Sequence, residues 1–169
     1  MKVSRRAFLK VSGSLVLGLA LPARGQAATE LNAWIVVQPN DLVLIRYARS
    51  EMGQGSMTGC AQLVAEELDC DWSRVRVEYV DANQQFKRKR VWGAMAAAGS
   101  QTIRTSQEYL RLAGATAREM LIAAAAQGWN VPAAECSASL GVVTHAPSGR
   151  KTTYGPSPRR RPSSRRRAR

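Results

Sequence analysis

The feature that most constrains the fold is a change of hydrophobic period in the middle of the chain. Residues 74–80 alternate polar and apolar side chains, which predicts a half-buried strand. Before it, from Ser56 to about Asp69, apolar residues recur every three or four positions, which predicts a helix with one buried face. The apolar positions of that helix are Met57, Cys60, Val64 and Leu68. A chain with this pattern folds by packing helices on a sheet.

Patterned segments on both sides extend this arrangement. Asn32–Val37 and Leu42–Tyr47 are runs of strand-forming residues around the turn-forming Gln38–Asp41, so we expect a hairpin. Residues 137–154 predict a second small hairpin, with its turn at Pro147–Gly149.

A long helix is expected over Gln101–Gln127, with Gly128 as its stop. Its apolar stripe consists of Leu110, Ala113, Ala117, Met120 and Ala124. Residues Asp81–Arg90 are expected to form a polar loop, whose basic run Lys87–Arg90 is either solvated or an anion site. The order of the segments predicts an α+β fold: a mixed sheet with two long helices packed on it.

The net charge of +13 is concentrated at the two ends. The first thirty residues have five basic and one acidic side chain, and the last fourteen have seven arginines and no acid. Residues 31–155 carry 13 basic and 11 acidic side chains. The body of the protein therefore lacks the basic surface that a nucleic-acid-binding domain requires, and we expect no nucleic-acid partner.

The first 28 residues have the features of an export signal. The sequence S-R-R-A-F-L-K at 4–10 is similar to the bacterial twin-arginine motif, an apolar stretch follows at 11–21, and small residues precede a cleavage position near Ala28. This apolar stretch is roughly half the length that spans a bilayer. We expect export of an already folded protein to the periplasm, without a stable membrane anchor. That route is needed mainly when a cofactor is inserted before export.

The last fourteen residues, 156–169, contain only Pro, Ser, Arg and Ala and are expected to be disordered. They are either a basic interaction tail or the product of a frameshift, because alanine codons of a GC-rich gene encode arginine or proline when read one frame off. The folded part of the chain is then 29–155.

The cysteines and the single histidine do not predict a metal site. Cys60, Cys70 and Cys136 lack C-x-x-C spacing, and Cys60 lies on the apolar face of a helix, so it is interpreted as a small buried hydrophobe. A Cys60–Cys70 bridge in an oxidising compartment stays open. His145 has no partner cluster nearby in the sequence and is interpreted as a loop or strand-edge residue.

The residues with the clearest chemical pattern are 50–55, S-E-M-G-Q-G, between a strand and a helix. Two glycines around Gln54 let the backbone approach a ligand closely, and the N–H groups at the start of the following helix suit an anion such as a phosphate. Taken alone, the same pattern also fits a tight turn without a ligand.

Several separated motifs together resemble the molybdopterin-binding subunits of the xanthine dehydrogenase and aldehyde oxidase family, in particular the exported branch typified by the isoquinoline oxidoreductase large (beta) subunit. The resemblance covers residues 4 to about 155. The motifs are E-M-G-Q-G at 51–55, the opening W-I-V-V-Q-P-N-D at 34–41, residues 99–104, A-A-A-A-Q-G-W at 123–129, the pattern at 134–145, and S-G-R-K-T-T-Y-G at 148–155.

This resemblance implies a molybdenum–molybdopterin cofactor, in the cytosine dinucleotide form common in that branch. It implies cofactor contacts at Met52, Gly53, Gln54 and Gly55, with a second phosphate or pterin contact at Gly99, Ser100 and Gln101. The family often has paired glycines before the serine, whereas Ala98 stands here. The implied reaction hydroxylates an aldehyde or N-heterocycle with water as oxygen source, and electrons leave through a separate 2Fe-2S iron–sulfur subunit.

The catalytic glutamate of that family lies near the end of a much longer chain and has no counterpart here, so we assign no catalytic residue. The chain is therefore expected to be an N-terminal fragment of the subunit and to be inactive alone. A different class stays open: a small secreted basic protein that binds nucleic acid or anionic lipid through its arginine-rich tail. A third possibility is a domain without a ligand, whose unpartnered apolar stripe would promote aggregation.

Overall fold

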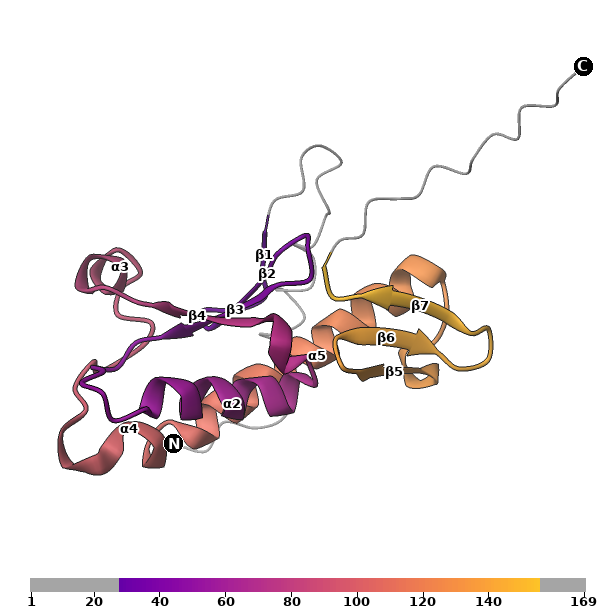
Figure 1. The fold of residues 1–169 in the computed structure, drawn as a ribbon. Coiled ribbons are helices and arrows are strands. Elements are labelled where there is room, and N and C mark those ends of the chain that lie inside the picture. Colours follow the sequence, from indigo (N-terminus) through magenta and orange to yellow (C-terminus); the bar gives the residue numbers. More distant parts are fainter. Residues whose placement is uncertain (1–27, 156–169) are drawn as a thin grey trace, which may run out of the picture.

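The computed structural model describes residues 28–155, so the expected export signal and the arginine-rich tail lie outside the described residues. Helices and strands alternate irregularly along the chain, and the predicted α+β class is confirmed (Figure 1). Within these residues no helix is long and apolar enough to cross a membrane. The elements are β1 Thr29–Glu30, β2 Ile35–Val37, β3 Val43–Tyr47, α2 Ser56–Leu68, β4 Val75–Tyr79, α3 Ala82–Lys87, α4 Gln101–Arg104, α5 Gln107–Trp129, β5 Cys136–Ser139, β6 Val142–His145 and β7 Arg150–Thr153.

The first sheet is mixed and has the strand order β1-β2-β3-β4. The expected hairpin is present, because β2 and β3 pair antiparallel with Ile35 opposite Ile45. Strand β4 pairs parallel to β3 with Val43 opposite Val75, and α2 forms the connection between them. Helices α2 and α5 lie next to each other along one face of this sheet (Figure 1).

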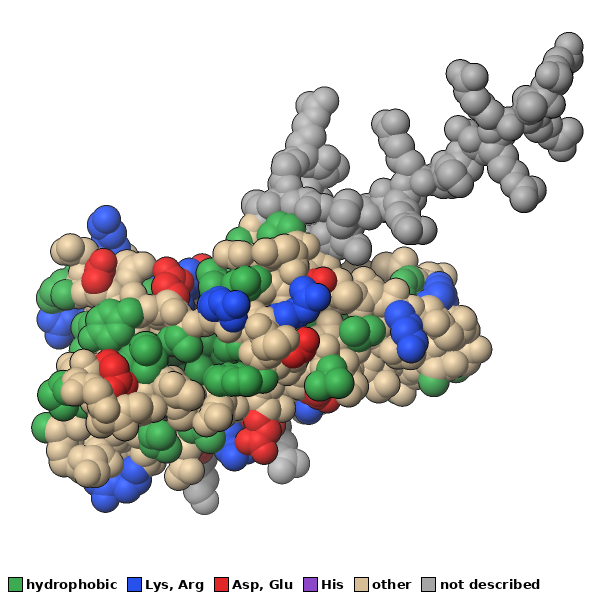
Figure 2. All heavy atoms as spheres, viewed as in Figure 1, with side chains coloured by type: hydrophobic (Ala, Val, Ile, Leu, Met, Phe, Trp, Pro, Cys, Tyr) green, Lys and Arg blue, Asp and Glu red, His purple; other side chains and the backbone are tan. Residues whose placement is uncertain are grey.

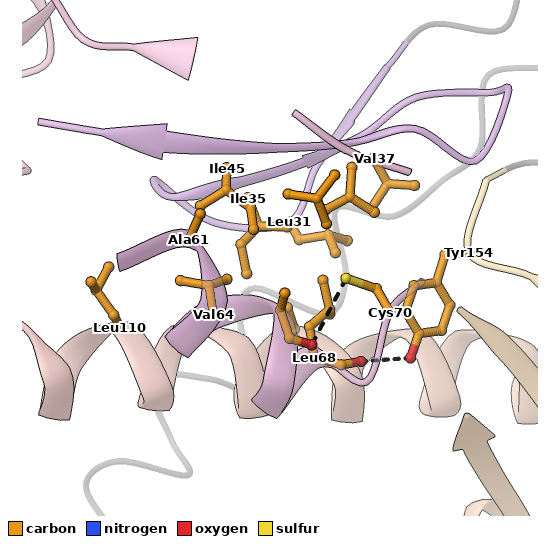
Figure 3. Packing of buried hydrophobic residues seen from close by; sticks show 14 of the residues in the cluster. Leu31, Ile35, Val37, Ile45, Ala61, Val64, Leu68, Cys70, Leu110 and Tyr154 are labelled. Carbon is orange, nitrogen blue, oxygen red and sulfur yellow. Dashed lines mark hydrogen bonds between the residues drawn. The ribbon is translucent and has the colours of Figure 1, made fainter. Parts of the chain in front are cut away.

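The predicted buried face of α2 is confirmed at three of its four positions and forms the centre of the core. Cys60, Val64 and Leu68 are buried, while Met57 is only partly covered. Figure 3 shows Val64 and Leu68 between the sheet residues above and α5 below, where Leu110 also points into the core. This packing removes the apolar side chains of α2 from water, at roughly 25 cal/mol for each Å² buried.

Helix α5 packs very closely against α2 where Gly114 faces it. A Cβ atom added at Gly114 would lie 2.5 Å from the carbonyl oxygen of Val64 and 3.2 Å from the backbone nitrogen of Leu68. The helix backbones therefore approach each other at a distance that only glycine permits. The predicted stripe of α5 is correct for Leu110 and Ala117 but wrong at Ala124, which is exposed.

The long helix expected over residues 101–127 is interrupted, and its end is later than expected. Helix α4 ends at Arg104 and α5 begins at Gln107. At the break, the Thr105 hydroxyl donates to the carbonyl of Gln101, a side-chain bond that competes with helical backbone bonding. The helix also continues through Gly128, because Asn130 adopts the left-handed conformation that ends it.

The C-terminal part forms a three-stranded antiparallel sheet of its own rather than one hairpin on a shared sheet. The turn between β5 and β6, which the sequence analysis did not predict, is formed by Leu140 and Gly141. Both residues have positive φ, as in two-residue hairpin turns. The expected turn at 147–149 is present between β6 and β7. The buried Tyr154 attaches this sheet to α2, because its hydroxyl donates to the carbonyl of Leu68 at 2.7 Å (Figure 3).

Two other expectations are corrected by local side-chain hydrogen bonds. Strand β2 begins at Ile35 instead of Asn32, because the Asn32 side chain accepts the backbone N–H groups of Trp34 and Ile35 and forms a turn. The segment expected as a loop over 81–90 contains α3, whose start is stabilised by reciprocal bonds between Asp81 and Gln84.

Candidate functional site

The loop 50–55 joins the end of β3 to the start of α2. Gly53 and Gly55 have φ values of 95° and 76°, which favour glycine, and open space lies beside both α-carbons. Gly55 is the N-cap of α2, and Ser56 is the first helical residue. The glycines therefore have the conformational role predicted for them, a sharp change of direction that leaves the backbone accessible.

The sequence led us to expect free backbone N–H groups at this loop. Instead, the Glu51 side chain accepts hydrogen bonds from them. Its carboxylate accepts the backbone N–H groups of Gly53 and Gly55 at 3.0 Å each and that of Met57 at 2.9 Å. These bonds, the one from Met57 foremost, hold the pKa of Glu51 below its ordinary value of 4.5. The chain thus supplies its own anion at the start of α2.

The side chain of Gln54 is folded into the loop. Its amide nitrogen donates to the carbonyl of Ser50 at 2.9 Å and to the hydroxyl of Ser56 at 2.7 Å, and its oxygen accepts the N–H of Met52 at 2.6 Å. Beneath the loop, the buried hydroxyl of Tyr47 lies 2.8 Å from that of Ser56, and burial raises the pKa of this tyrosine. The side chains of Glu51 and Gln54 thus both stabilise the loop through hydrogen bonds within it.

The second predicted segment lies at the same end of the molecule, where α2 and α4 begin (Figure 1). The backbone N–H of Ser50 donates to the carbonyl of Met95 at 2.7 Å, and the Arg49 guanidinium donates to the carbonyl of Ala96 at 3.1 Å. Gly99 and Ser100 both have positive φ, at 69° and 54°. All seven predicted cofactor contacts, Met52, Gly53, Gln54, Gly55, Gly99, Ser100 and Gln101, are exposed at this end.

Sequence reasoning missed Arg49 as the residue that connects the two segments. Besides its bond to Ala96, its guanidinium donates to the Thr105 hydroxyl at 3.2 Å. Its Nε is buried and has no hydrogen-bond partner among the described residues. A basic residue at the end of a strand just before a glycine loop was the available signal.

Apolar side chains are exposed around this end of the molecule. Figure 2 shows hydrophobic side chains gathered over the part of the face where the first sheet lies above α2. The large exposed ones in α3, α4, the end of β4 and the neighbouring loops are Met52, Tyr79, Phe86, Val91 and Ile103. Such a surface is typical of contact with further protein or with a ligand.

Two other features lie away from the predicted contacts. A groove of about 240 Å³ with a mainly apolar lining runs between α5 and β7, bordered by Leu121, Trp129 and Tyr154. His145, interpreted from the sequence as a loop or strand-edge residue, ends β6 and is buried, and its ring nitrogens bond Ser148 at 2.6 Å and Glu135 at 2.8 Å. These bonds stabilise the β6–β7 turn.

The cysteines behave as the simplest interpretation predicted. All three are free thiols, so the Cys60–Cys70 bridge is not formed. Burial raises the pKa of both Cys60 and Cys70 to about 11, which leaves them unreactive near neutral pH. Within residues 28–155 no group of three or more His, Cys, Asp or Glu residues is arranged to hold a metal ion.

The described residues thus form an α+β domain with an exposed G-Q-G loop beside a second glycine-bearing segment. The sequence profile of the molybdopterin cofactor-binding domain matches residues 11–158. The chain belongs to this molybdopterin cofactor-binding family.

Two curated relatives resemble the chain over most of its length. Isoquinoline 1-oxidoreductase subunit beta from Brevundimonas diminuta is 37% identical over 167 residues, covering 91% of this chain and 21% of the relative. A membrane-bound aldehyde dehydrogenase [pyrroloquinoline-quinone] from Gluconacetobacter polyoxogenes is 28% identical, covering 90% and 21%. The chain thus spans about a fifth of the length of these relatives.

Among solved structures, quinoline 2-oxidoreductase from Pseudomonas putida 86 matches with a TM-score of 0.46 and 19% identity, covering 72% of this chain and 15% of that one.

Proposed function

We propose that this chain forms part of the pterin site of a molybdenum hydroxylase subunit. The observation that carries the proposal is the meeting of two segments more than forty residues apart, 50–55 and 95–101, through the bond between Ser50 and Met95. Most residues of both segments are exposed, and both segments contain residues with positive φ, so a ligand can come close to their backbones. The family to which the chain belongs is named for binding this cofactor.

The residues present fit the pterin better than the phosphates of the cofactor. Gly53 and Gly55 leave open space that any larger residue would fill. The amide group of Gln54 has the donors and the acceptor that the hydrogen-bonding edge of an uncharged ring requires, and on binding it would exchange its present bonds to Ser50, Met52 and Ser56 for bonds to the ring. A phosphate does not fit at the start of α2, because the Glu51 carboxylate already accepts the N–H groups that would bind it. In the bound state Met52, Gly53, Gln54 and Gly55 would hold the pterin, with Gly99, Ser100 and Gln101 beside it.

The whole protein would hydroxylate an aldehyde or an N-heterocycle with water as the oxygen source. The cofactor supplies the redox chemistry, while the residues of this chain bind and orient it. Two curated relatives support this substrate range by their names, isoquinoline 1-oxidoreductase and aldehyde dehydrogenase. The proposal includes the cytosine dinucleotide form of the cofactor and a 2Fe-2S partner subunit. It also includes export to the periplasm by the signal at residues 4–10.

The test is cofactor retention by the chain itself. The full chain is produced in a host that makes molybdenum cofactor, and its pterin content is measured by fluorescence after oxidation. We expect pterin in the wild-type protein and a large loss in Gln54→Ala. Gln127→Ala is the matched control, because Gln127 is exposed near the other end of α5. Wild-type protein without pterin, or equal content in all three proteins, would contradict the proposal.

A further inference from the structure

The carboxylate of Glu51 clamps the two glycines that flank Gln54. Its Oε1 accepts the N–H groups of both Gly53 and Gly55, and its Oε2 accepts that of Met57. The Ser56 hydroxyl lies 3.5 Å from the same Oε2. One side chain therefore fixes the backbone directly before and directly after the residue that would contact the pterin.

The loop needs such a clamp because its glycines are intrinsically flexible. A glycine with positive φ has many other conformations available to it, so ordering two of them costs conformational entropy. Hydrogen bonds from N–H groups to a carboxylate are roughly twice as strong as neutral ones. With Glu51 in place, this entropy is lost on folding rather than on ligand binding, which favours binding.

The clamp also determines which part of a cofactor the loop can receive. The start of a helix binds phosphate through its free N–H groups. Here the N–H groups of Gly53, Gly55 and Met57 already bond a negative charge, which repels a second one. An uncharged ring meets no such repulsion.

We propose that Glu51 is a positioning and specificity-determining residue of the candidate cofactor site: it holds the G-Q-G backbone ready for the pterin and excludes phosphate from the start of α2. This inference rests on the proposed function. Glu51 acts through the backbone beside Gln54 and does not itself contact the reacting atoms, so it is not a catalytic residue.

The test compares wild type with Glu51→Gln, which removes the charge at nearly constant size. The control is Glu119→Gln, since Glu119 is exposed and its ion pair with Arg118 is long, at 3.9 Å. Amide hydrogen exchange, followed by NMR, is expected to become about tenfold faster or more at Gly53, Gly55 and Met57 in Glu51→Gln. Exchange within the body of α2, and in the control throughout, is expected to stay at the wild-type rate.

A second measurement separates positioning from a purely structural role. Inorganic phosphate is titrated into each protein while the amide resonances of Gly53, Gly55 and Met57 are followed. We expect these resonances to shift in Glu51→Gln and to stay unchanged in wild type and in Glu119→Gln. The pterin content of Glu51→Gln, measured by fluorescence after oxidation, is expected to fall about tenfold.

Each outcome decides between the two proposals. Wild-type exchange rates in Glu51→Gln, no phosphate response, or wild-type pterin content despite faster exchange would each overturn the role of Glu51. Absence of pterin from the wild-type chain would overturn the proposed function and the pterin-positioning role that rests on it. In that case the exchange and phosphate measurements still show whether Glu51 closes the loop against anions.

Discussion

Substituting Gly114 by alanine tests the close approach of α5 to α2. The added Cβ would lie 2.5 Å from the Val64 oxygen and 2.9 Å from the Glu67 Cβ. The nearest of these atoms belongs to the backbone of α2, so it cannot rotate away, and the helices must move apart. Overpacking of this kind costs roughly 1–3 kcal/mol. Because the clash is with backbone atoms, we take the upper part of that range, about 2–3 kcal/mol. Alanine regains about 1 kcal/mol over glycine in a helix, so we expect a net loss of about 1–2 kcal/mol.

The same substitution at Gly128 is the matched control. Gly128 lies in the last turn of the same helix, and no atom of residues 28–155 comes within 4 Å of a Cβ added there. Only the helix propensity remains, so Gly128→Ala is expected to stabilise the protein by about 0.5 kcal/mol. The two variants, measured by urea unfolding of the full chain, should therefore have opposite signs. If Gly114→Ala were as stable as Gly128→Ala, the helices would not pack as described.

Three further predictions concern the rest of the molecule. Tyr154→Phe is expected to lower the free energy of unfolding by about 1–2 kcal/mol in urea melts, because the carbonyl of Leu68 loses a buried donor; an unchanged melt would refute that contact. In native protein at pH 8 the thiols of Cys60 and Cys70, with pKa values of about 11, should resist a thiol reagent that modifies them at once in urea. Because the pKa of Glu51 is lowered in the folded protein, its stabilising bonds are complete above pH 4.5 and are lost as the pH falls below that value. Urea midpoints should accordingly fall more steeply on acidification in wild type than in Glu51→Gln, and parallel curves would count against it.

Local hydrophobic period was sufficient to predict the centre of the fold. Alternation over 74–80 and the three-to-four spacing from Ser56 located β4 and α2 to within a residue or two. Helix α2 buries Cys60, Val64 and Leu68 of its predicted face. The predicted face of β4 is buried only in part, because Val75 is buried, Val77 is half-buried and Tyr79 is exposed. The G-Q-G loop was also placed correctly between a strand and a helix, because glycine is required where φ is positive.

What could not be predicted depends on contacts between distant residues or on competing side chains. The break between α4 and α5 occurs beside Thr105, whose hydroxyl bonds both Gln101 and the distant Arg49. Helix α5 ends at Asn130 and not at Gly128. Both residue types can adopt the left-handed conformation that ends a helix, so the sequence alone does not determine which of the two positions ends α5. Within the site, the sequence shows an acidic residue, Glu51, before the glycine loop, but it does not predict that the Glu51 carboxylate bonds the backbone of that loop.

The bonds at the end of the described chain set a limit on the order in which this protein can fold. The three-stranded sheet β5–β7 is held by neighbouring strands with short turns and needs little of the chain before it. Its attachments are remote: Tyr154 bonds Leu68 across 86 residues, and the Gly155 N–H bonds the Asp41 carboxylate across 114. During synthesis on the ribosome, the carbonyl of Leu68 at the end of α2 therefore lacks its tyrosine donor until residue 154 has emerged.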